Sequence, residues 1–64
     1  MNHDIVLEFY FLALRDIENG ASIDELEGAI KLYEEEENYE ACAGILKAIH
    51  EAKYSTIKNI KNES

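Results

Sequence analysis

The segment Ile5–Leu14 constrains this chain most, because its apolar residues cover nearly the whole circumference of a helix and only Glu8 interrupts them. Two stripes follow helical spacing: Val6, Phe9, Ala13 and Ile17 form one, and Leu7, Tyr10 or Phe11, and Leu14 form the other. A helix that is apolar all round is buried on more than one side. A chain of 64 residues is too short to surround it, so we expect a second copy or a partner to cover it.

Chain length independently favours self-association. A chain of about 60 residues buries only about 60% of the surface that its unfolded form exposes. The single cysteine, Cys42, cannot form a disulfide within the chain, and no set of metal ligands stands out. The alternative is a monomer in which Tyr10 and Phe11 are partly exposed. We predict a homo-oligomer whose interface contains Val6, Phe9, Tyr10, Phe11 and Leu14.

Helix start and stop signals divide the chain into helical segments, and no proline interrupts them. The first is expected to run from residue 2 or 3 to Glu18. Asn19–Gly20 follows, and both residue types tolerate the left-handed backbone conformation that ends many helices. The second begins after Ser22, which forms a capping-box pair with Glu25. It ends in the acidic run Glu34–Glu37, which opposes the helix dipole and should fray that end.

The third segment is expected to begin after Asn38, which is its predicted N-cap, and its apolar stripe runs from Tyr39 to Ile60. The short connection to the second segment predicts an antiparallel helical hairpin. The first helix then packs across this hairpin. The predicted fold is therefore all-α, a single domain over residues 1–64, with three helices in a self-associating bundle.

The charge is unevenly distributed along the chain. Residues 1–40 carry a net charge of −10 and residues 41–64 carry +2, which gives −8 overall. Direct binding to duplex nucleic acid or to an anionic membrane surface is disfavoured, because both need a positive surface. We predict that Glu34, Glu35, Glu36 and Glu37 form a surface for a basic protein partner. The alternative is a solvated face that only keeps the protein soluble.

Basic and polar residues gather towards the end of the chain. In an oligomer, copies of this side could converge on a phosphate-bearing ligand such as a nucleotide. Alternatively, the lysines pair with acidic faces of neighbouring helices, and each pair contributes about 0–1 kcal/mol. The candidate ligand-binding residues are Lys47, His50, Lys53, Tyr54 and Lys58.

No motif in the sequence has the residues and spacing of an enzyme active site. Cys42 and His50 are eight residues apart, or about 12 Å along a helix, whereas a nucleophilic pair needs contact near ~3 Å. The Glu-x-x-His pattern of di-iron bundles fails, because Lys47 precedes His50 by three. Gly28 and Gly44 belong to no phosphate loop and fall inside helices, where we expect them to allow close helix approach. We predict no enzymatic activity, no cofactor and no metal.

The N-terminal apolar stretch is not predicted to be a secretory signal. Asp4 precedes it and Arg15–Asp16 follow it, whereas a signal begins with positive charge and ends in small residues. We predict a cytoplasmic protein, in a bacterial cell or in a host cell.

The sequence from Tyr39 to Ile49 resembles the second helix of the UVR-type hairpin, a family named for the bacterial excision-repair subunits. The resemblance covers residues 26–50 and implies a protein-interaction module, not a repair activity. In size and acidity the chain also resembles phage accessory proteins. We therefore predict a regulatory or inhibitory protein–protein interaction module, and the alternative is an oligomer that sequesters a nucleotide-like ligand. The matching positions are Tyr39, Glu40, Cys42, Ala43, Ile45 and Ile49, and Leu46–Lys47 replace the family's Arg-Asp pair.

Overall fold

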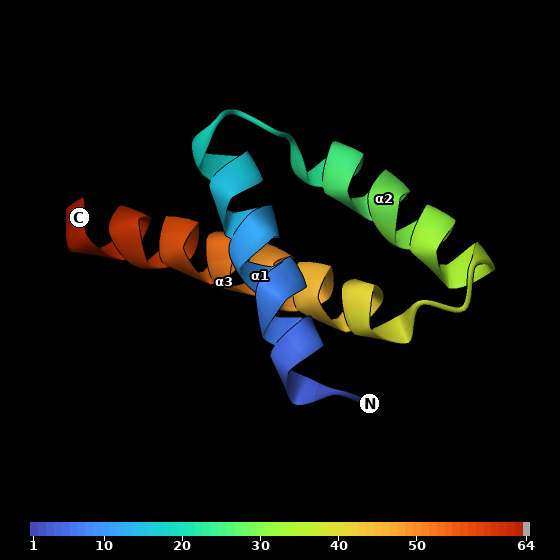
Figure 1. The fold of residues 1–64 in the computed structure, drawn as a ribbon. Coiled ribbons are helices and arrows are strands. Elements are labelled where there is room, and N and C mark those ends of the chain that lie inside the picture. The colour runs from blue at the N-terminus through green and yellow to red at the C-terminus, as the bar shows by residue number, and fades with distance from the viewer. Residues whose placement is uncertain (64) are drawn as a thin grey trace.

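The computed structural model describes the backbone of residues 1–63 and the side chains of residues 1–54. Three helices make up the fold: α1 (His3–Glu18), α2 (Ile23–Glu35) and α3 (Tyr39–Glu63). Helix α3 packs against both α1 and α2, and α1 crosses it (Figure 1). The predicted all-α fold of three helices is confirmed, with a hairpin of α2 and α3 crossed by α1.

The start of each hairpin helix is capped as the sequence predicts. The Ser22 hydroxyl accepts a hydrogen bond from the backbone N–H of Glu25 at 3.1 Å. The Asn38 side-chain oxygen accepts one from the N–H of Ala41 at 3.3 Å. Each cap satisfies a backbone donor that has no partner inside its helix. The predicted caps are therefore confirmed.

The N-terminus of α1 is held to α3. The Asn2 side chain caps α1 by accepting a hydrogen bond from the N–H of Asp4 at 2.9 Å. The backbone N–H of Asn2 donates to a carboxylate oxygen of Glu40 at 2.8 Å. These two contacts fix where α1 begins relative to the first turn of α3.

Helices α1 and α2 end in the same hydrogen-bond pattern. After α1, Gly20 has a positive φ of 99°, and the N–H of Ala21 donates to the carbonyl of Asp16 at 2.9 Å. After α2, Glu37 takes the equivalent position with a φ of 59°, and the N–H of Asn38 donates to the carbonyl of Tyr33 at 2.9 Å. Both are Schellman motifs, in which a left-handed residue closes the helix. Glycine takes this conformation without strain, whereas a glutamate does not.

Glu37→Gly is therefore expected to stabilise the fold by about 1 kcal/mol, because it removes the left-handed strain and a negative charge at a helix C-terminus. The matched control is Glu36→Gly, which makes the same charge change where φ is −85° and no such strain exists. Thermal unfolding should show a higher midpoint for the Glu37 variant only. Equal midpoints for the two variants would contradict this account of the turn.

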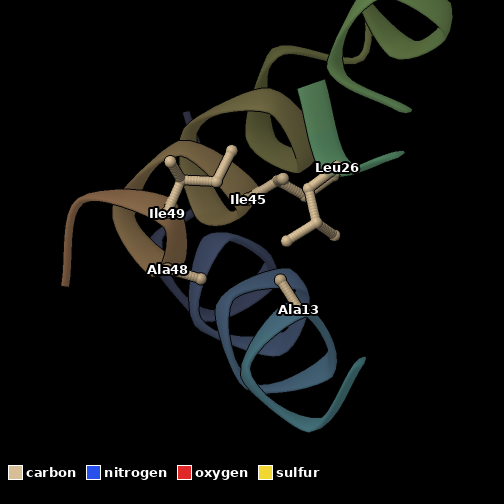
Figure 2. Packing of buried hydrophobic residues seen from close by; sticks show 5 residues of the cluster. All are labelled: Ala13, Leu26, Ile45, Ala48 and Ile49. Carbon is tan, nitrogen blue, oxygen red and sulfur yellow. The ribbon is translucent and has the colours of Figure 1, made fainter. Parts of the chain in front are cut away.

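A small apolar core joins the three helices. Ala13 of α1 and Leu26 of α2 meet Ile45, Ala48 and Ile49 of α3 (Figure 2). Each helix thus contributes at least one buried side chain to a single cluster. Half-buried residues pack around it, namely Tyr10, Leu14, Ile17, Ile23, Ala29, Ile30 and Tyr33.

Gly44 brings the backbone of α3 against the backbone of α1. A Cβ built on Gly44 would lie 2.8 Å from the Cβ of Phe9 and 2.8 Å from the backbone nitrogen of Tyr10, and would also meet the carbonyl oxygen of Val6. Apart from its chain neighbours and the backbone of its own helix, no described atom lies within 4 Å of a Cβ built on Gly28. The prediction that glycine allows close approach is confirmed for Gly44 and is wrong for Gly28, because α2 turns that position away from its neighbours.

Candidate functional site

An apolar groove lies between α1 and α2, with α3 as its floor. Its volume is about 230 Å³. We call it the α1–α2 groove. Its lining residues are Phe9, Leu12, Ala13 and Asp16 from α1, Leu26, Ala29 and Tyr33 from α2, and Ile45 from α3.

The groove exists because α1 and α2 both pack mainly on α3 instead of on each other. Gly44 draws α1 down onto α3, and α2 is held by its short connection to the start of α3. The rings of Phe9 and Tyr33 bridge α1 and α2 edge to face, with centroids 5.5 Å apart. Away from this aromatic bridge, the space between the two helices stays open.

A second depression extends the groove towards the connection between α1 and α2. It has a volume of about 440 Å³, and Asn19, Gly20 and Ala21 of the connection contribute to its wall. Asp16 and Leu26 line both depressions. Together they make one surface feature that follows α1 and α2.

Exposed leucines and acidic residues mark the edges of the groove. Leu12 lines it and is 55% exposed. Leu32 is 63% exposed and follows Ala29 by three residues, so it lies on the neighbouring part of the α2 surface. Asp16 lines the groove, and Glu25 lines its extension. The site thus combines an apolar centre with negative charge at its edge.

Sequence reasoning assigned Phe9 to an interface and missed the other groove residues as a binding site. Leu12 belongs to neither apolar stripe of the first helix, and Leu26, Ala29 and Tyr33 look like ordinary core positions. The position of Leu12 outside both stripes could have indicated a binding surface, because a large apolar residue outside the stripes cannot reach the core of a small bundle.

The structure buries some residues of the predicted oligomer interface within the chain and leaves others exposed. Val6 is only 8% exposed because it packs within the chain, Phe9 contacts Tyr33, and Leu14 packs on the core. Phe11 is 61% exposed, and its ring lies 5.1 Å from that of Tyr10. Phe11 is the most exposed of the five predicted interface residues. Self-association stays a prediction.

The acidic run Glu34–Glu37 is exposed at the end of α2. One of its members affects the nearby Cys42 thiol, which donates a hydrogen bond to the carbonyl of Ile30 at 3.4 Å. Partial burial and the charge of Glu34 both raise the pKa of the Cys42 thiol. The thiol therefore stays protonated near neutral pH and is not an activated nucleophile.

The predicted ligand-binding residues whose side chains are described do not line one common depression among those of residues 1–54. The Lys47 amine lies 5.2 Å from the centroid of the Tyr10 ring, a cation–π contact between α3 and α1. Lys53 lines a separate depression with Ile17 and Ile23. His50 and Tyr54 are exposed, and Lys58 lies outside the residues whose side chains are described.

Tyr10 also contacts Glu51, because its hydroxyl donates a hydrogen bond to that carboxylate. This hydrogen bond raises the pKa of the Tyr10 phenol, and desolvation and the charge of Glu51 act in the same direction. A pKa that is higher in the folded chain than in the unfolded chain adds stability below about pH 10, and this stability is lost as pH rises further.

Tyr10→Phe is accordingly expected to flatten the alkaline loss of stability. Between about pH 9 and 11, thermal unfolding midpoints of the parent chain should fall more steeply than those of the variant. The difference between the two slopes isolates Tyr10 from lysines and from the other tyrosines. Parallel slopes would show that the Tyr10–Glu51 hydrogen bond does not form in solution.

Two further features bear on what the site can do. Among the described residues, no three His, Cys, Asp or Glu side chains gather where they could hold a metal ion. Within the same part of the chain, none of the helices combines the length and apolar character needed to cross a membrane.

Comparison with protein-family models, with curated proteins and with solved structures finds no match to this chain. The likeness to the UVR-type hairpin therefore stays a prediction.

Proposed function

We propose that this chain is a non-enzymatic protein-interaction module whose α1–α2 groove receives an apolar segment of a partner protein. The observation that carries the proposal is an open apolar groove with the exposed Leu12 at its edge. Exposed apolar surface that is bordered by polar residues is typical of interaction sites and binding grooves. By covering the partner's segment, the chain regulates or inhibits it.

A helix is the segment that suits the groove best. Its lining residues come from α1 and α2 on either side and from Ile45 of α3 between them. A docked helix would complete a four-helix arrangement and would bury Leu12 together with the neighbouring Leu32. Recognition of an apolar helix face by a groove between helices is a recurrent mode of peptide binding.

The test is a matched pair of charge insertions in α1. Leu12→Glu places a charge in the groove, and Phe11→Glu places one on the adjacent residue, which is similarly exposed but does not line the groove. A partner is first captured from cell lysate with the tagged chain, identified by mass spectrometry and purified. Its affinity for each variant is then measured by calorimetry.

Leu12→Glu should weaken binding at least about tenfold, as loss of a buried anchor does, whereas Phe11→Glu should change it little. Circular dichroism checks that both variants keep their helices. Loss of binding with Phe11→Glu alone, or full binding by Leu12→Glu, would exclude the groove as the binding site.

A further inference from the structure

We infer that the α1–α2 groove selects a basic amphipathic helix of another protein, an inference that rests on the proposed function. The lining residues give two kinds of surface. Leu12, Leu26 and Ala29 are apolar, and the charged residues are Asp16 in the groove and Glu25 in its extension. An apolar helix face that is flanked by lysine or arginine matches both kinds at once.

Acidic residues continue along both edges of the groove. On α1, Glu8 precedes Leu12 by four residues and Asp16 follows it by four, so these three share one side of the helix. On α2, Glu36 follows Leu32 by four residues. All three acids are exposed, so a partner's cations can reach them.

The basic residues of α1 and α2 do not balance the acids along the groove. Lys31 follows the groove residue Ala29 by two positions, which places it on nearly the opposite side of α2. Arg15 follows Leu12 by three positions and Glu8 by seven, so it lies on the same edge of α1 as these two residues. One cation among the acidic residues of the two walls leaves a net negative charge along the groove.

The same charge argues against a second copy of this chain as the occupant. Residues 1–40, which include both walls, carry a net charge of −10. Docking α1 or α2 of another copy would set like charges against each other. The basic stretch of the chain is α3, in which Ile45, Ala48 and Ile49 are already buried against α1 and α2. Its exposed large apolar side chains among the described residues are Tyr39, Leu46 and Tyr54, which are seven and eight residues apart and so form no continuous apolar helix face. Charge complementarity thus selects a basic helix from a different protein.

The test uses two synthetic helical peptides as probes. Both carry leucines at positions i, i+3, i+4 and i+7, and the flanking positions are lysine in one peptide and glutamate in the other. Each is titrated into the full-length protein by fluorescence anisotropy, and amide chemical shifts map where it binds. We expect the lysine peptide to bind at least about tenfold more tightly than the glutamate peptide, and this preference should shrink in about 0.5 M salt.

Charge-reversal variants identify the residues that cause the preference for the lysine peptide. The double variant Asp16→Lys with Glu25→Lys should lose the preference for the lysine peptide. The control is Glu18→Lys with Glu27→Lys, which makes the same net charge change at exposed positions two residues further along each helix, facing away from the groove. The control should keep the preference.

Each other outcome overturns a defined part of this account. Equal binding of both peptides in the groove, or equal loss of preference in the two double variants, overturns the basic-helix inference and leaves the proposed function standing. Absence of shifts at the groove with either peptide overturns both. A free protein that sediments as a dimer, and that the lysine peptide converts to monomer, would show that the occupant is a second copy.

Discussion

Gly44→Ala is expected to destabilise this protein by about 2 kcal/mol. The new Cβ would lie 2.8 Å from both the Cβ of Phe9 and the backbone nitrogen of Tyr10. Neither neighbour is the end of a flexible side chain, so α1 as a whole must move away from α3. Overpacking of this kind costs about 1–3 kcal/mol or more, and alanine's better helix propensity returns about 1 kcal/mol.

The matched control is Gly28→Ala, in the middle of α2. No described atom beyond its own stretch of helix lies within 4 Å of a Cβ at that position, so the same substitution brings only the gain in helix propensity, about 1 kcal/mol. Thermal unfolding should lower the midpoint by about 10 °C for the Gly44 variant and raise it for the Gly28 variant. Midpoints that move together would mean that α1 does not pack on Gly44 as described.

Ile49→Ala should cost about 3 kcal/mol. Ile49 is 2% exposed and lies in the cluster that joins the three helices (Figure 2). Truncating a buried isoleucine loses the transfer free energy of its methyl and methylene groups and leaves a cavity, for a typical cost of about 2–5 kcal/mol. Since small domains have only modest stability to lose, part of this variant should be unfolded at 37 °C.

Leu46→Ala provides the comparison, because it removes an aliphatic side chain three residues earlier on the same helix. Leu46 is 48% exposed, so the loss should stay below about 1 kcal/mol. Urea unfolding of the two variants under the same conditions measures the difference directly. A loss at Leu46 as large as that at Ile49 would indicate that a partner or a second copy covers the outer face of α3.

The sequence alone does not distinguish the buried from the exposed residues of the last segment. The apolar stripe of the last segment contains Ile45, Leu46 and Ile49 at acceptable helical spacings. Ile45 and Leu46 are adjacent, so they point about 100° apart. Ile45 is buried in the core, whereas Leu46 is 48% exposed. The crossing of α1 over Gly44, a contact between residues far apart in the chain, fixes which one is buried.

The candidate site was predictable only in part. Its acidic character follows from the net charge of residues 1–40, and the expectation of an unpaired apolar surface on the first helix follows from its composition. The structure places that surface at Phe11 and Leu12 instead of at all five predicted interface residues, because Val6 packs within the chain and Phe9 contacts Tyr33.

The sequence alone determined the helix boundaries and caps, because hydrogen bonds between residues a few positions apart decide them. Ser22 with Glu25, Asn38 with Ala41, and the stop at Gly20 all belong to this class. Only the tertiary structure decided which face of each helix is buried. The close approach at Gly44 and the groove beside Leu12 arise from how rigid helices pack on one another, and no local pattern specifies that packing.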